Sequence, residues 1–178
     1  MIARRRLCQT PPTHAMPVEL RLSAEAAAGE PARPVVVDTN VTIDLLIFSD
    51  PRTAPLRTLL AEGRLAWIAT PVMRDELERV LAYPHIVSRM DYYRVDASKV
   101  LAAFDAQVRL VEIAPRVPYV CKDADDQKFI DLAGAHQAIL LSKDKAVICM
   151  RKRLIALGAQ VATALVLEPA DEPEPSEA

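Results

Sequence analysis

The chain has 178 residues and a formal net charge of −2, from 22 Lys and Arg against 24 Asp and Glu. Hydrophobic residues make up 51% of it and charged residues 26%, the balance of a globular domain that can bury its own core. The overall charge does not indicate a nucleic-acid partner, and no apolar run reaches the roughly 18 residues of a membrane span.

The two ends of the chain differ in composition from its middle. Residues 1–33 are rich in Pro, Ala and Gly and contain little that could pack into a core, so we expect a flexible leader. Residues 170–178 are acidic and proline-rich, and we expect a disordered tail there. The folded domain should therefore span residues 34–169.

Strand-like and helix-like patterns alternate between the two ends. Residues 35–37 predict a first strand, and Asn40 is placed to cap the helix that follows to residue 48. Predicted helices then cover residues 55–62, 71–82, 98–107 and 125–136, and a last one ends near residue 157. The other predicted strands are 65–69, 110–113, 138–141 and 161–167. Such alternation predicts an α/β fold with a mostly parallel sheet between helices.

Cysteine usage indicates a reducing compartment. Cys8, Cys121 and Cys149 are scattered and include no Cys-x-x-Cys pair, so neither a disulfide framework nor a zinc site is predicted. We expect buried, reduced thiols in a cytoplasmic protein.

Two acidic residues follow strands of the predicted sheet. Asp38 comes directly after the strand 35–37, and Asp144 comes after the strand 138–141, with Ser142 and Lys143 between. Ligands of open parallel sheets bind at the carboxyl ends of the strands. If these two strands are neighbours, both carboxylates face the same crevice.

Two further acids interrupt the apolar faces of helices. Glu76 shares the inward stripe of the helix that begins at Pro71, and Asp126 heads the face that continues through Phe129 and Ile130. A carboxylate on a buried face is costly unless it is paired or binds a metal ion. Both residues are therefore candidates for the same site.

Each acid taken alone also has a structural explanation. Asp38 can begin a turn, Asp123 and Asp126 can form a capping pair, and Asp144 can be a first-turn acid. Glu76 resists this explanation, because the middle of an apolar stripe is a poor place for a structural carboxylate. Four acids at one end of one sheet are less expected by chance than any one of them alone.

These segments, in this order, resemble the motifs of PIN domains. Residues 35–40 (VVVDTN) resemble the opening strand motif, and Glu76 in residues 71–77 resembles the second acid. Residues 123–130 resemble the third acidic segment of one branch, and residues 141–144 the fourth motif. That branch comprises toxin components of bacterial toxin–antitoxin systems. The resemblance covers residues 34–169.

The resemblance implies a three-layer sandwich with a sheet of about five strands. It also implies Mg²⁺- or Mn²⁺-dependent endoribonuclease activity, a homodimer, and a cognate antitoxin that blocks the acidic pocket. The third acid stays open in this comparison. Asp126 is the first choice because its helical phase points inward, Asp123 is the second and Asp125 the third.

An all-carboxylate site favours one or two Mg²⁺ or Mn²⁺ ions, since hard cations take oxygen ligands and the chain has only three histidines. One ion would activate the attacking water and a second would stabilise the leaving oxygen. Asn40 and Ser142 are placed to orient the metal ligands through hydrogen bonds, without contacting the ion themselves. The expected ligands are Asp38, Glu76, Asp126 and Asp144.

An RNA substrate needs cations near this acidic pocket. Lys143 and Lys145 flank Asp144 and are candidates for backbone contacts. The basic residues at positions 151–153 are further candidates for contacts with the RNA backbone, but an ordinary solvated helix face explains them equally well. Those residues are Arg151, Lys152 and Arg153.

Two other functions fit parts of the same pattern. A receiver-like Mg²⁺-binding signalling domain should carry adjacent acids after its first strand, whereas only Asp38 stands there. A PIN fold without catalytic activity, serving as a metal- or RNA-binding module, would not need all four acids.

Overall fold

The structure is a computed structural model, and it describes residues 17–169. The tail expected at residues 170–178, the first sixteen residues of the expected leader, and Cys8 lie outside the described residues. None of the helices in residues 17–169 has the length and hydrophobicity that a bilayer-crossing segment needs.

Within the described range, seven strands form two sheets, and every strand pairing is parallel. The larger sheet has the order β4-β3-β2-β5-β6, and the smaller one pairs β1 with β7. The strands are β1 (Glu19–Ser23), β2 (Arg33–Val37), β3 (Leu65–Ala69), β4 (Arg109–Leu110), β5 (Ile139–Leu141), β6 (Gln160–Ala162) and β7 (Ala164–Glu168).

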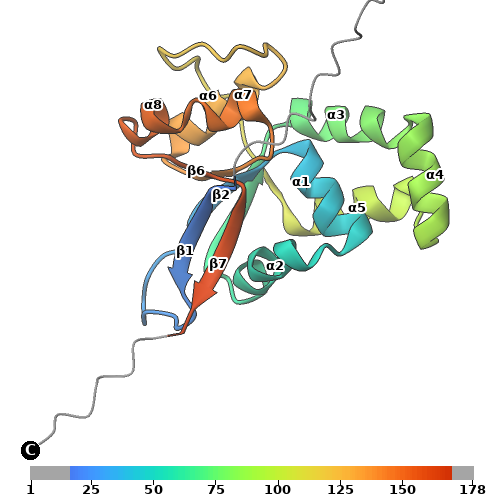
Figure 1. Cartoon of the computed structure of the whole chain (residues 1–178), viewed down its shortest axis with the longest axis horizontal. Helices are drawn as coiled ribbons and strands as arrows, with labels where there is room; N and C mark the ends of the chain where they lie inside the picture. The colour runs from blue at the N-terminus through green and yellow to red at the C-terminus, as the bar shows by residue number, and fades with distance from the viewer. Residues whose placement is uncertain (1–16, 170–178) are drawn as a thin grey trace, which may run out of the picture.

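Helices lie on both sides of these strands, so the predicted three-layer α/β architecture with a five-stranded parallel sheet is confirmed. Figure 1 shows α6, α7 and α8 on one side and α1 to α5 on the other. The helical segments are α1 (Thr39–Ile43), the π-type turn η1 (Asp44–Phe48), the 3-10 turn η2 (Pro51–Thr53), α2 (Ala54–Ala61), α3 (Pro71–Leu81), α4 (Pro84–Tyr93), α5 (Ala97–Gln107), α6 (Gln127–His136), α7 (Lys145–Ile148) and α8 (Arg151–Ile155).

The core is centred on the pairing of β2 with β5. Val35 and Val36 in β2 and Ile139 and Leu140 in β5 are completely buried. Continuous apolar runs of this kind are typical of parallel strands that are covered on both faces. The register places Val35 opposite Ile139 and Val36 opposite Leu140, so the two strands end at the same edge of the sheet.

The prediction of a flexible leader is wrong for residues 19–23, because they form β1. This strand pairs along its whole length with β7. Leu20 and Leu22 alternate with exposed residues, which is the two-residue period of a half-buried strand. The proline- and alanine-rich flanks hide this short pattern. The last predicted strand is also divided, since β6 and β7 separate at Thr163, whose hydroxyl accepts a hydrogen bond from the Val18 amide at 2.9 Å.

Sequence patterns missed α4, assigned the wrong cap to α1 and did not divide the last helix. Pro84 follows α3 closely, as a helix-ending proline would, and it also occupies the first turn of α4, where its fixed φ and missing N–H are tolerated. The N-cap position of α1 is occupied by Asp38, not Asn40, and the Asp38 side chain makes no capping hydrogen bond. The helix predicted to end near residue 157 is divided into α7 and α8. Cys121 is buried as expected, whereas Cys149 is exposed.

We expect Ile68→Ala to lower the free energy of unfolding by about 2–5 kcal/mol, because Ile68 is completely buried in β3 and its removal leaves a cavity. The measurement is urea unfolding followed by circular dichroism. Ile155→Ala on α8 is the matched control: Ile155 is 58% exposed, so its truncation should change stability by less than about 0.5 kcal/mol. Equal effects of the two substitutions would contradict this view of the core.

Candidate functional site

Asp38 is the buried centre of the carboxylate cluster. It follows β2, and its backbone N–H donates a hydrogen bond to the Leu141 carbonyl at 2.9 Å, which extends the β2–β5 ladder by one residue. Its side chain is only 4% exposed, and its Oδ2 accepts a hydrogen bond from Ser142 Oγ at 2.6 Å. Burial raises the pKa of Asp38, the nearby Glu76 and Asp144 raise it further, and the Ser142 hydrogen bond acts in the opposite direction.

Ser142 and Asp144 are held by the turn between β5 and α7. Ser142 Oγ, which donates to Asp38, also accepts a hydrogen bond from the Asp144 N–H at 3.0 Å. Asp144 Oδ1 in turn accepts one from the Ala146 N–H at 2.7 Å and caps α7. Asp144 is therefore the N-cap of α7 and not an acid within its first turn, as the structural explanation had placed it. Ser142 thus contacts Asp38 directly, and its role in orienting a metal ligand stays a prediction.

Glu76 reaches the cluster from α3 and has two partners that the sequence reasoning missed. Its Oε1 accepts a hydrogen bond from Thr39 Oγ1 at 2.8 Å, and its Oε2 forms an ion pair with the Lys128 ammonium. The Glu76 and Lys128 side chains are each 22% exposed. Thr39 follows Asp38 directly in the chain, so its position was a usable signal. The position of Lys128 two residues after Asp126 is a weaker signal.

Asp126 supplies the least satisfied oxygen of the site. It stands at the start of α6, and its Oδ2 is buried with no hydrogen-bond partner. Burial raises the pKa of Asp126 to about 7, and the carboxylates of Asp38, Asp144 and Asp123 contribute in the same direction. A buried anionic oxygen without a donor has the environment that a bound cation would satisfy.

The other two candidates for the third acid lie further out. Asp123 and Asp125 are both exposed, and Asp123 Oδ1 accepts a hydrogen bond from the Asp125 N–H at 2.9 Å. Asp123 contributes to the raised pKa of Asp126, whereas Asp125 is not among the causes of that shift. The choice among the three acids stays a prediction.

Gln127 anchors the long loop that leads into α6 and carries Asp123. It is buried; its Oε1 accepts a hydrogen bond from the Cys121 N–H at 2.7 Å, and its Nε2 donates to the Tyr119 carbonyl at 3.0 Å. The same amide donates to Asp131 Oδ1 at 2.8 Å. A buried amide with three satisfied bonds fixes a loop that has no regular structure of its own. No periodicity in the sequence marked this role.

The four predicted acids are close enough to influence pKa values within the set, because Glu76 and Asp144 act on Asp38, and Asp38 and Asp144 act on Asp126, although they do not form a coordination shell. In the part of the chain that the structure describes, no group of three or more His, Cys, Asp and Glu side chains stands close enough together to hold an ion. Lys128 binds Glu76, and Ser142 binds Asp38. The donor set nevertheless fits a hard cation, because it offers carboxylate oxygens and one of them is buried without a partner.

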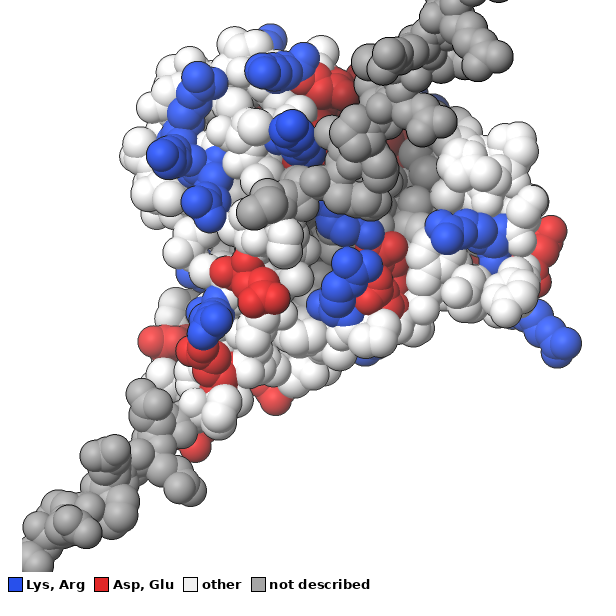
Figure 2. Space-filling model, in the orientation of Figure 1, with Lys and Arg blue, Asp and Glu red and all other residues white. Residues whose placement is uncertain are grey.

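The remaining predicted residues are distributed unevenly around the cluster. Asn40 is exposed, and no hydrogen bond within residues 17–169 joins its side chain to the four acids. Lys143 forms an ion pair with Asp44, while Lys145 is exposed. Figure 2 shows basic side chains gathered over the region where Figure 1 draws α7 and α8. The exposed basic residues of α8 are Arg151, Lys152 and Arg153.

Comparison with known proteins identifies the family of the chain that carries this acidic site. The sequence model of the PIN domain matches residues 34–146, which is more than half of the chain. The chain belongs to the PIN-domain family. An uncharacterized protein of Methanocaldococcus jannaschii is 29% identical to it over 119 residues, which cover 66% of this chain and 74% of that protein. PIN domains are generally nucleases that use divalent metal ions, so membership supports a hydrolase that acts on nucleic acid.

We expect the metal-free protein to lose stability as the pH rises from about 4 to about 7. The folded state raises the pKa of Asp126 from 3.8 to about 7, so in this window it binds more protons than the unfolded chain does. Thermal unfolding in EDTA across this range is the measurement. In Asp126→Asn, which has no proton to lose, the decline should be shallower. An equally steep decline in the variant would exclude Asp126 as its source.

We also expect Lys128→Met to increase the affinity for Mn²⁺, because an ion at Glu76 must displace the Lys128 ammonium. A partly exposed ion pair contributes on the order of 1 kcal/mol, so the dissociation constant should fall roughly fivefold. Isothermal titration calorimetry measures it, and Lys99→Met, at an exposed lysine of α5, is the control. Unchanged or weaker binding in Lys128→Met would show that Lys128 does not compete with the ion.

Proposed function

We propose that this protein is a Mg²⁺- or Mn²⁺-dependent endoribonuclease whose one or two ions are held by carboxylates at the carboxyl edge of the sheet. The observation that carries the proposal is the buried, unpartnered Oδ2 of Asp126 near the buried Asp38. Two such carboxylates repel each other, and a hard cation between them removes that repulsion. The proposed ligands are Asp38, Glu76, Asp126 and Asp144, with Asp123 as the alternative to Asp126.

The protein's own residues would orient these ligands. Ser142 fixes one carboxylate oxygen of Asp38, and Thr39 fixes one of Glu76. When bound, the metal ion supplies the acidity that activates a water molecule and the positive charge that stabilises the leaving oxygen of the phosphodiester. The burial of Asp38 at the base of the cluster would keep bulk water from competing for its oxygens.

The proposal extends to the biological setting. The motif resemblance supports a toxin of a toxin–antitoxin pair, with a cognate antitoxin that covers the acidic site, and a homodimer. The scattered cysteines support a cytoplasmic location, where the buried thiol of Cys121 stays reduced.

A second candidate is a PIN-fold module that binds metal or RNA without cleaving it. It is favoured by the Lys128–Glu76 ion pair and by the use of Asp144 as a helix cap, since both engage carboxylates that catalysis would need. Membership of the PIN-domain family argues against the receiver-like signalling domain.

The deciding experiment compares wild type with Asp38→Asn for Mn²⁺ binding by calorimetry and for cleavage of single-stranded RNA. We expect the variant to lose roughly 100-fold or more in cleavage rate and to bind Mn²⁺ much more weakly, because the buried ligand loses its charge. Asp105→Asn is the matched control: Asp105 is an exposed acid on α5 that pairs with Arg74, and its loss should leave both readouts unchanged.

The outcomes separate the two candidates. Saturable Mn²⁺ binding in wild type without cleavage of RNA or DNA would favour the binding module. Absence of Mn²⁺ and Mg²⁺ binding at millimolar concentrations would contradict both, because the cluster would then be a purely structural arrangement.

A further inference from the structure

A cleft between the ends of α2 and α5 is separate from the acidic site. It has a volume of about 440 Å³, which is within the range of ligand-binding clefts. It is lined by the second half of α2, the first three residues of β3 and the last two residues of α5. Both helices lie on the side of the strands opposite α6 to α8 (Figure 1). None of the four predicted acids lines the cleft, so a ligand there would not compete with the metal ion.

Trp67 brings an unsatisfied hydrogen-bond donor to this cleft. The residue lines the cleft but is only 2% exposed, and its Nε1–H has no acceptor within residues 17–169. An indole N–H can only donate, and a buried donor without an acceptor is costly. The ring is held in place by Phe104, which packs edge-to-face against it with 5.3 Å between the ring centroids. The fold therefore lacks an acceptor at this point, and a ligand can supply it.

Arg57 and Gln107 add further donors to the cleft. Among the described residues, Arg57 is the one charged residue that lines it, and Arg57 forms no ion pair within residues 17–169. Its Nη2 donates to the Leu45 carbonyl at 2.9 Å, which positions the guanidinium and leaves its other N–H groups for a ligand. The Gln107 amide donates to the Ala103 carbonyl at 3.2 Å. Because no carboxylate lines the cleft, the anion that suits this donor set must come with the ligand.

The rest of the lining is apolar, and it narrows the class of ligand. Apolar walls with a few converging polar groups are typical of small-molecule sites. A single guanidinium balances a single negative charge, and its planar fork matches the two oxygens of a carboxylate. A hydrocarbon body gains free energy by covering the walls. The apolar lining residues are Leu60, Ala61, Leu65, Ala66 and Ala106.

We propose that this cleft binds a small monocarboxylate with an apolar body. The carboxylate pairs with the Arg57 guanidinium and accepts the Trp67 indole N–H, while the hydrocarbon part rests on the apolar walls. Trp67 Nε1 is shielded from solvent, so the exposed side chains of Arg57 and Gln107 shift when the ligand enters. Side-chain rotamer changes of this kind are common on binding. The site goes beyond the proposed nuclease function and is independent of it, because it needs neither metal nor RNA.

The experiment uses Trp67 itself as the reporter, because it is the one tryptophan of the chain. Its indole emission and its single indole N–H signal in a proton–nitrogen NMR spectrum are followed while phenylacetate is titrated into the full, metal-free chain at neutral pH. Phenylacetamide has the same shape without the charge, and phenethylamine carries the opposite charge. The three dissociation constants are compared at one ionic strength.

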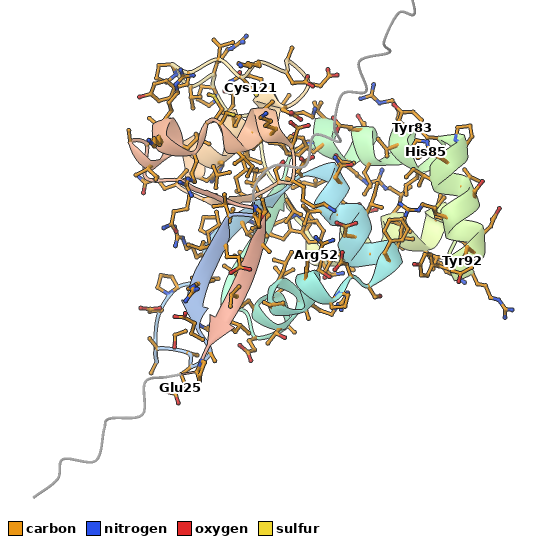
Figure 3. All side chains as sticks on the ribbon, viewed as in Figure 1. Glu25, Arg52, Tyr83, His85, Tyr92 and Cys121 are labelled. Atoms are coloured by element: carbon orange, nitrogen blue, oxygen red, sulfur yellow. The ribbon has the colours of Figure 1, made fainter. Side chains whose placement is uncertain are left out.

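Three variants separate the contributions to binding. Arg57→Gln removes the cation at an exposed position, so the fold should be retained. Arg52→Gln is the matched control, because Arg52 is an exposed arginine in η2, directly before α2, that does not line the cleft (Figure 3). Trp67→Phe keeps an aromatic ring and removes the N–H. Binding to this variant is measured by isothermal titration calorimetry, and circular dichroism verifies that it folds.

We expect phenylacetate to bind wild type with a dissociation constant of about 1 mM or below and to shift the indole N–H proton downfield. Phenylacetamide and phenethylamine should each bind at least roughly tenfold more weakly, because neither forms a charge-assisted pair with Arg57. Arg57→Gln should weaken phenylacetate binding roughly tenfold and remove the preference over the amide. Trp67→Phe should weaken it by roughly fivefold or more, since one donor is lost. Arg52→Gln should behave as wild type.

Equal affinity for the three probes would overturn the inference, because the cleft would then be an apolar surface without selection for an anion. So would an indole N–H signal that stays in place at saturation, or wild-type affinity in Arg57→Gln. Equal weakening by Arg52→Gln and Arg57→Gln would also overturn it, since the attraction would then come from overall charge. The titrations contain no metal and no RNA, so their failure leaves the proposed nuclease untouched, and the absence of cleavage leaves this site untouched.

Discussion

The pairing of β2 with β5 is the constraint on which the site depends. Val37 is opposite Leu141, and the ladder continues one residue further through the hydrogen bond from Asp38 N–H to the Leu141 carbonyl. This pairing brings Ser142 within 2.6 Å of a carboxylate that is 104 positions away in the chain. A slip of one residue would turn Asp38 to the opposite face of the sheet and separate the two groups. The buried valines of β2 prevent that slip, because it would change every contact that they make with the two helical layers.

The same edge concentrates negative charge that the fold only partly neutralises. Ser142 donates to Asp38, Thr39 donates to Glu76, and Lys128 pairs with Glu76, while one oxygen of Asp126 is left buried and unpartnered. A sequence selected for stability alone would not keep such a group, since its desolvation is uncompensated. Local violations of this kind are concentrated at functional sites, where a ligand completes the interaction. The carboxylate that the fold satisfies least is therefore the strongest indication of what the site binds.

The sequence predicted those features that depend on local pattern, and it missed those that depend on distant partners. The buried run of β2, the acid after it and the acid on the apolar stripe of α3 could all be identified from residue spacing. Pro84 was ambiguous, because a proline ends one helix and starts the next with equal ease. Lys128 and Gln127 were missed for a different reason. Their roles are set by Glu76 and by the loop before α6, which only the folded chain brings to them.

Helix α4, which the sequence patterns missed, carries none of the four predicted acids, so it bears on which substrate binds and not on the reaction itself. The acidic edge is built by β2, α3, α6 and the β5–α7 turn, and the PIN-domain match over residues 34–146 includes the acids that these elements carry. A groove that Asn40 and Asp144 line has one wall from α4, which carries none of the four predicted acids but contributes His85 and Arg89 to that groove. A fold fixes where reaction can occur, whereas loops and variable elements around it determine what reaches that place. The substrate preference of this protein should therefore be sought in α4, since changes there can alter binding without disturbing the carboxylates that the β2–β5 pairing holds.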